Sequence, residues 1–178
     1  METENRFLNE QEVRAAYLVW ISDMSEQVEI EKWVTSQFAE LTSYGFSEPI
    51  IKREDWNTVI DWLGTDIAIE LELDWREFDI FLLIVRLEGG QLPQGYYVSN
   101  GEPCRFHLQK IIKENGWSVA LNEMKAISPS GKRRGLQKPN VDNLRQRVLA
   151  YKVVLMSCIK QIVANSGTIF TDSKTAQS

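Results

Sequence analysis

The 178-residue sequence predicts an α+β fold, in which a small antiparallel β-meander of about four strands is packed by N-terminal helices and a long C-terminal helix. Apolar residues recur at every third or fourth position near both ends of the chain, a spacing typical of amphipathic helices. Between Asp66 and Trp75 they instead alternate with polar residues, as in a half-buried strand. The pair Asn100-Gly101 favours a tight hairpin, because both residues tolerate positive φ.

The N-terminal third of the chain is expected to form three helices. An Asn-x-x-Glu capping box at residues 9–12 begins the first. Ser25 caps the second, whose first turns are rich in glutamate, and Gly45 ends it. The third is predicted from about Arg53 to Leu63, where apolar residues again recur at helical spacing, and it stops at Gly64.

The strands follow, joined by short links that favour an antiparallel meander. The alternating segment 66–75 is the first, and a two-residue turn at 76–77 leads to the second at 78–87. That second strand is apolar on both faces, which predicts a central position in the sheet. Residues 96–98 and 104–107 flank the Asn-Gly turn and are predicted as the remaining pair.

The C-terminal part is predicted to be helical, with one long interruption. A short helix covers 108–114, a surface loop covers 118–139, and the last helix runs from near Asn140 to about Val163. We expect residues 1–170 to form a single globular domain and residues 171–178 a flexible polar tail.

Cysteine and histidine are scarce, which excludes several classes of site. Cys104 and Cys158 are the two cysteines and His107 is the sole histidine, fewer residues than a zinc site or a hydrolase triad draws on. The opening residues do not resemble a signal peptide, and no apolar run reaches the roughly 20 residues of a membrane span. We therefore expect a cytoplasmic protein with no metal, no cofactor and no membrane contact. The oligomeric state is not predicted.

Charge is distributed unevenly along the chain. Residues 1–100 hold 7 Lys and Arg against 20 Asp and Glu, whereas residues 101–178 hold 13 against 5. The front half therefore carries a net charge of −13 and the back half +8. Such asymmetry indicates either surfaces that attract oppositely charged partners or two halves that neutralise one another.

One face of the strand at 66–75 is the best candidate for a binding site. The turn at 76–77 would set its acidic residues opposite Leu83, Phe81 and Asp79 of the next strand. Crowded carboxylates beside apolar neighbours meet a basic group, bind a divalent cation or stay solvated on an outer face. Tyrosines at 96–97 add an apolar anchor of a type enriched at interfaces. The candidate partner-binding residues are Glu70, Glu72, Asp74, Tyr96 and Tyr97.

A second candidate surface is the basic loop 132–138. Its positive side chains can neutralise phosphates or dock onto an acidic partner, although a loop of this charge is equally compatible with plain solvation. It has no interleaved aromatic residues for base stacking. The basic residues of this loop are Lys132, Arg133, Arg134 and Lys138.

These observations favour a non-enzymatic cytoplasmic interaction protein, of the adaptor, antitoxin or immunity type, that binds a protein partner through the acidic strand face. The sequence has no nucleophile–base pair, phosphate loop or dinucleotide fingerprint. One alternative is a metal-dependent phosphodiesterase that uses the same carboxylates. Asp66 with Glu70-Leu71-Glu72 resembles the acidic part of a restriction-type nuclease site, but the lysine that activates water there is missing. The other alternative is a nucleic-acid accessory protein that uses the basic loop.

Overall fold

The computed structural model describes residues 25–119, 124–125, 127 and 140–170. The chain divides into two compact units between Ser36 and Gln37. Residues 25–37 are helical, as expected for the second predicted helix. The capping box at 9–12, the basic loop and the tail at 171–178 lie outside the described residues, and the expectation of a single domain stays a prediction.

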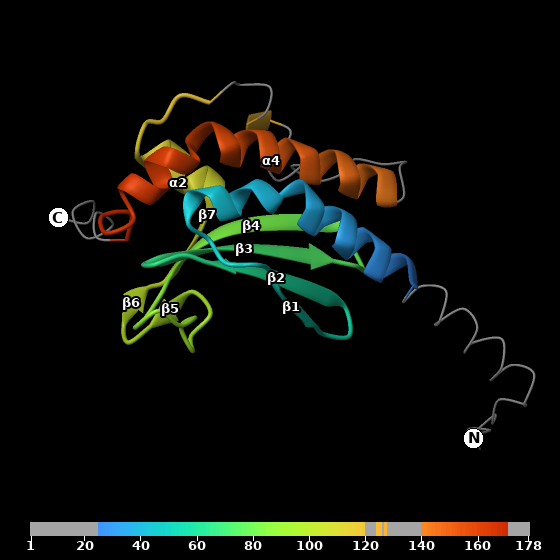
Figure 1. Cartoon of the computed structure of the whole chain (residues 1–178), viewed down its shortest axis with the longest axis horizontal. Helices are drawn as coiled ribbons and strands as arrows, with labels where there is room; N and C mark the ends of the chain where they lie inside the picture. Colours follow the sequence, from blue (N-terminus) through green and yellow to red (C-terminus); the bar gives the residue numbers. More distant parts are fainter. Residues whose placement is uncertain (1–24, 120–123, 126, 128–139, 171–178) are drawn as a thin grey trace, which may run out of the picture. The chain divides into compact units, whose positions relative to one another are not determined.

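The second unit is built on an antiparallel sheet of five strands in the order β1-β2-β3-β4-β7 (Figure 1). The α+β class is therefore confirmed, with one strand more than the four expected. The strands of this sheet are β1 Ile50–Arg53, β2 Asn57–Leu63, β3 Ile67–Asp74, β4 Asp79–Arg86 and β7 Arg105–His107.

The register of β3 and β4 is the predicted one. Glu70 pairs with Leu83, and the flanking pairs follow from the same turn. The alternate residues of β3, Ile69 and Leu71, are fully buried in the core. Because side chains along a strand alternate between faces, this register places the acidic residues of β3 on the opposite face.

The helix predicted from Arg53 to Leu63 is wrong, because this segment forms the turn and second strand of the β1–β2 hairpin. The spacing of its apolar residues fits both a helix and a strand. In the structure Ile60 and Trp62 point to the core, while Val59 lies on the other face of the sheet. Two β-branched residues in succession, Val59 and Ile60, also favour a strand over a helix. Pairing with β3 along seven positions decides the outcome.

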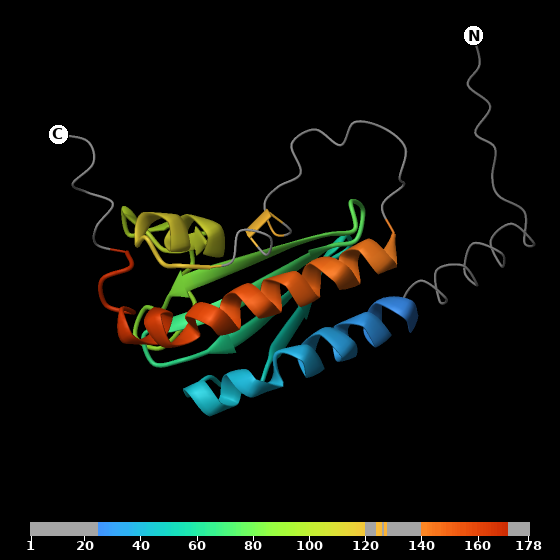
Figure 2. The same cartoon turned by 90° about the horizontal axis from the view of Figure 1, so that it is seen from above.

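Helices cover one face of the sheet. The C-terminal helix α4, Val141–Ala164, packs against β4 and against the 3-10 helix η1, Ala39–Tyr44 (Figure 2). The Asn140 side chain caps α4 by accepting a hydrogen bond from the Asn143 amide, as its predicted start requires. The predicted apolar stripe of α4 is buried: Leu144, Val148, Tyr151, Leu155, Ile159 and Ile162.

The short helix α2, Leu108–Glu114, has the predicted bounds and follows β7 directly. None of the helices in the described part of the chain is long and apolar enough to cross a membrane.

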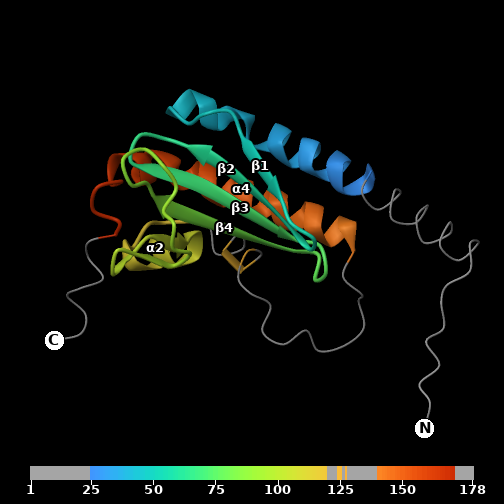
Figure 3. The ribbon, with the colours of Figure 1, turned by 90° about the horizontal axis from the view of Figure 1, so that it is seen from below.

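The Asn-Gly hairpin forms, but outside the main sheet. Strands β5, Val98–Ser99, and β6, Glu102–Pro103, make a small sheet of their own, and β7 takes the place beside β4. Asn100 and Gly101 both have positive φ, 52° and 79°, as the tight turn demands. The face of the main sheet turned away from α4, called the open face below, is seen in Figure 3.

Candidate functional site

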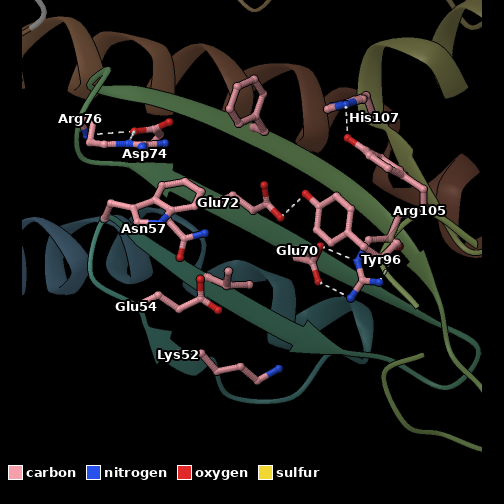
Figure 4. Close-up of a pocket in the computed structure, with 14 residues that line it drawn as sticks. Lys52, Glu54, Asn57, Glu70, Glu72, Asp74, Arg76, Tyr96, Arg105 and His107 are labelled. Atoms are coloured by element: carbon pink, nitrogen blue, oxygen red, sulfur yellow. Dashed lines mark hydrogen bonds and ion pairs between the residues drawn. The ribbon is translucent and has the colours of Figure 1, made fainter. Parts of the chain in front are cut away.

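The open face of the sheet is hollowed by a pocket of about 660 Å³, called the strand-face pocket below (Figure 4). All five residues predicted to bind a partner line it, so the fold brings Tyr96 and Tyr97 to the acidic face of β3. Among the described residues, four carboxylates and three cations contribute to the lining. The lining residues are Lys52, Glu54, Trp56, Asn57, Val59, Glu70, Glu72, Asp74, Arg76, Phe81, Tyr96, Tyr97, Arg105 and His107.

Glu70 is neutralised from within the chain by Arg105. The Nε and Nη2 groups of Arg105 donate to the two carboxylate oxygens at 2.7 and 3.0 Å. Its Nη1 group donates to the carbonyl oxygens of Gly95 and Tyr96, both at 2.7 Å. Burial raises the pKa of Glu70, and the hydrogen bonds and charge of Arg105 oppose that rise. The pair therefore fastens β7 and the segment before β5 to the middle of the sheet.

Asp61 lies beside Glu70 on β2 and is fully buried. Its Oδ2 atom accepts a hydrogen bond from the Lys52 ammonium at 2.9 Å, whereas its Oδ1 atom has no hydrogen-bond partner among the described residues. The acidic strand face is thus partly compensated by Lys52 and Arg105. Arg147 of the basic helix α4 pairs instead with Asp79, at the start of β4.

Glu72, at the centre of β3, is in a different situation. Its Oε1 atom accepts a hydrogen bond of 2.5 Å from the Tyr96 hydroxyl, and within the described ranges it forms no ion pair. Burial raises the pKa of Glu72, and the negative charges of Asp61 and Glu54 raise it further. Burial and the hydrogen bond to Glu72 likewise raise the pKa of the Tyr96 phenol. The surrounding residues therefore do not fully stabilise the ionised form of Glu72.

Asp74 stabilises the β3–β4 turn. Its Oδ1 atom accepts hydrogen bonds from the backbone amides of Arg76 and Glu77 at 2.9 and 3.1 Å. The Arg76 Nε atom lies 3.9 Å from the same oxygen, and its guanidinium carbon lies 4.1 Å from the centre of the Trp56 ring. An arginine stacked on an indole and close to a carboxylate therefore closes this end of the pocket (Figure 4).

The other wall is aromatic. Tyr96 and Tyr97 meet edge to face with ring centres 4.6 Å apart, and each is about half exposed. Both rings reach the pocket because this segment lies outside the main sheet, so the strand alternation that would separate them does not apply. The Tyr97 hydroxyl lies 3.3 Å from Nε2 of His107, whose pKa is lowered by burial. Burial therefore favours the neutral form of the His107 imidazole.

Sequence reasoning missed Arg105 and the residues of the β1–β2 hairpin. A signal for Arg105 was present, because a strand that turns Phe106 toward the core turns Arg105 to the face that carries Glu70. Trp56 and Asn57 were assigned to a helix and so were not considered. Asn57 lines the pocket with a buried Oδ1 atom that has no hydrogen-bond partner.

A metal site would require several converging ligands. Within the described residues, no group of three His, Cys, Asp or Glu side chains is placed to hold a metal ion. Glu70 directs both oxygens to Arg105, and Asp74 directs one to its own turn. The geometry of the β3 carboxylates therefore favours recognition of a cationic group over shared metal coordination.

Comparison of the chain with protein-family models, with curated proteins and with solved structures gives no match. The nucleic-acid alternative depends on Lys132, Arg133, Arg134 and Lys138, all outside the described residues, and it stays a prediction.

Proposed function

We propose that this protein is a non-enzymatic cytoplasmic interaction protein, of the adaptor, antitoxin or immunity type, which docks a basic segment of a protein partner onto the strand-face pocket. The observation that carries the proposal is the environment of Glu72. A half-buried carboxylate that forms no ion pair among the described residues, in the lining of an open pocket, gains most from a positive group brought by a partner.

The rim of the pocket supports a protein partner. Trp56, Tyr96 and Tyr97 are 41%, 47% and 48% exposed, and each offers a large rigid surface with a polar atom at its edge. Aromatic residues of this kind supply most of the binding energy at protein interfaces. Acidic groups around them steer a basic partner into place and raise the association rate.

The groups that catalysis would use are engaged in structural contacts. Four of the five N–H groups of Arg105 donate to Glu70 or to backbone carbonyls, so this guanidinium is largely committed to holding the fold. Asp74 holds a turn. A binding role therefore accounts for the pocket better than a catalytic one.

Site-specific photo-crosslinking in the native cell tests the proposal. A photoreactive phenylalanine analogue replaces Tyr97, and a matched variant carries it at Leu149, an exposed position on α4. We expect a discrete protein adduct from position 97 only, which disappears when Glu72→Gln is added and persists with Glu48→Gln. Equal adducts from both positions, or an adduct that is indifferent to Glu72→Gln, would contradict the proposal.

A further inference from the structure

The three carboxylates of β3 that line the pocket show a repeated arrangement. Glu70 is paired with Arg105, whose guanidinium carbon lies 5.1 Å from the centre of the Tyr96 ring. Asp74 lies beside Arg76, whose guanidinium stacks on Trp56. Two of the three carboxylates therefore each have an arginine that is held between an acid and an aromatic ring.

Glu72 stands between these two and lacks such an arginine among the described residues. Its partner is the Tyr96 hydroxyl, which donates to Oε1, and Oε2 has no hydrogen bond within the described part of the chain (Figure 4). A carboxylate accepts several hydrogen bonds, so the tyrosine does not exhaust Glu72. The neighbouring cations are committed elsewhere, Lys52 to Asp61 and Arg105 to Glu70.

Further acceptors lie around Glu72. Glu54 lines the same pocket from the turn between β1 and β2, and its charge acts on Glu72. A ligand with several N–H groups would therefore be able to donate to the oxygens of both Glu54 and Glu72.

A guanidinium fits these acceptors better than an ammonium does. It is planar, carries five N–H donors in a fixed fork, is weakly hydrated and stacks on aromatic rings. An ammonium is a compact, strongly hydrated charge that gains less from flat aromatic walls. The chain itself already places Arg76 and Arg105 on rings of this pocket, whereas its lining lysine, Lys52, is paired with Asp61.

From this arrangement we infer that the strand-face pocket is an arginine-recognition site, in which Glu72 binds the guanidinium of a partner's arginine side chain beside the aromatic rings of Trp56 and Tyr96. The inference rests on the proposed function and specifies the group that the partner inserts. Glu54 supplies additional acceptors, and the Tyr96 hydroxyl holds Glu72 in position.

The test uses the full chain and three end-blocked amino acids: N-acetyl-arginine amide, N-acetyl-lysine amide and N-acetyl-citrulline amide. Citrulline has nearly the shape of arginine without the charge. Binding is followed by NMR through the indole N–H signal of Trp56, assigned with a Trp56→Phe variant. We expect saturable binding of the arginine probe, weaker binding of the lysine probe and at least about tenfold weaker binding of the citrulline probe.

Variants locate the site. Glu72→Gln keeps the side-chain shape and should weaken the arginine probe about tenfold. Glu48→Gln makes the same charge change outside the pocket lining and should leave binding unchanged. Tyr96→Phe keeps the ring and removes the hydroxyl that holds Glu72 in position, so it should weaken the arginine probe, but less than Glu72→Gln does. Folding of each variant is checked by its dispersed NMR spectrum.

The outcomes separate this inference from the proposed function. A lysine probe that binds as tightly as arginine, or an arginine probe insensitive to Glu72→Gln, overturns the inference while the crosslink from position 97 still supports docking. Selective arginine binding without any crosslinked protein supports the guanidinium site and counts against a protein partner.

Discussion

On β3, three carboxylates two positions apart have three different environments. Glu70 is buried against Arg105, Asp74 accepts the backbone amides of a turn, and Glu72 has a tyrosine hydroxyl and no cation among the described residues. The alternation of the sequence predicts that these residues share a face. It does not distinguish their roles, because Arg105 and Tyr96 come from segments distant along the chain.

At the scale of this residue, Glu72→Gln should stabilise the fold at neutral pH. The pKa of Glu72 is raised in the folded protein, so the folded state holds a proton more tightly than the unfolded chain does. Stability therefore falls as the pH rises from the ordinary value of 4.5 through the raised pKa, and remains lower above it. Glutamine carries no charge and escapes this loss.

Thermal unfolding between pH 4 and pH 8 measures the effect. The melting temperature of Glu72→Gln should exceed that of the wild type at pH 7 and approach it near pH 4. Glu48→Gln is the control for net charge and should not shift the curve in this way. A variant that is less stable than the wild type at pH 7 would show that the Glu72 carboxylate serves the fold and not a ligand.

The same pKa rise predicts how binding depends on pH. A guanidinium binds the ionised form of Glu72, so the affinity for N-acetyl-arginine amide should fall as the pH is lowered through the raised pKa of Glu72. Arg105 and Tyr96 favour the ionised form, whereas Asp61 and Glu54 oppose it. The midpoint should lie above 4.5 and the dependence should vanish in Glu72→Gln. NMR titration at several pH values checks both statements, and a flat profile for the wild type would contradict them.

Among the helices and strands, those whose turn or end residues are compatible with one structure only were predictable from the sequence. The turn after Trp75 sets the β3–β4 register, and the Asn115-Gly116 end fixes α2. The β1–β2 hairpin was missed because its apolar spacing fits a helix and a strand equally well, and pairing with β3 decides between them. Because the hairpin was missed, its pocket residues Trp56 and Asn57 were missed as well.

The β5–β6 hairpin carries the aromatic wall, and its turn is its weak point. Gly101 has φ of 79°, and a Cβ atom there would meet nothing within 4 Å. Gly101→Ala should therefore destabilise the hairpin by backbone strain alone, about 1–2 kcal/mol. Hydrogen exchange of the hairpin amides measures the loss. Gly167→Ala, where a Cβ is also unobstructed and φ is not positive, should show no comparable effect. Equal protection in Gly101→Ala and the wild type would contradict the assignment of a strained turn.

For the whole molecule, the uneven charge of the two halves is partly resolved inside the fold. Ion pairs join acids of the first 100 residues to bases of the rest: Glu70 to Arg105, Asp79 to Arg147 and Glu40 to Lys152. The last of these is largely exposed and contributes little. The first is buried, with side chains 8% and 3% exposed, and it ties β7 to the centre of the sheet. The charge asymmetry of the sequence left internal neutralisation as one of two alternatives and did not indicate which residues would pair.

Because the pair is buried, removing one partner should be far more harmful than removing both. Arg105→Met leaves the Glu70 carboxylate buried without a cation and should cost about 3–5 kcal/mol of unfolding free energy. Adding Glu70→Leu replaces the pair with apolar side chains and should recover most of that loss. Recovery will be incomplete, since the carbonyl groups of Gly95 and Tyr96 also lose the hydrogen bonds that Arg105 donates. Urea denaturation of the wild type, both single variants and the double variant gives the coupling energy. A double variant no more stable than Arg105→Met would mean that Arg105 acts chiefly through the carbonyl groups of Gly95 and Tyr96. The attraction between the acidic and basic halves would then not be what holds the segment before β5 to the main sheet.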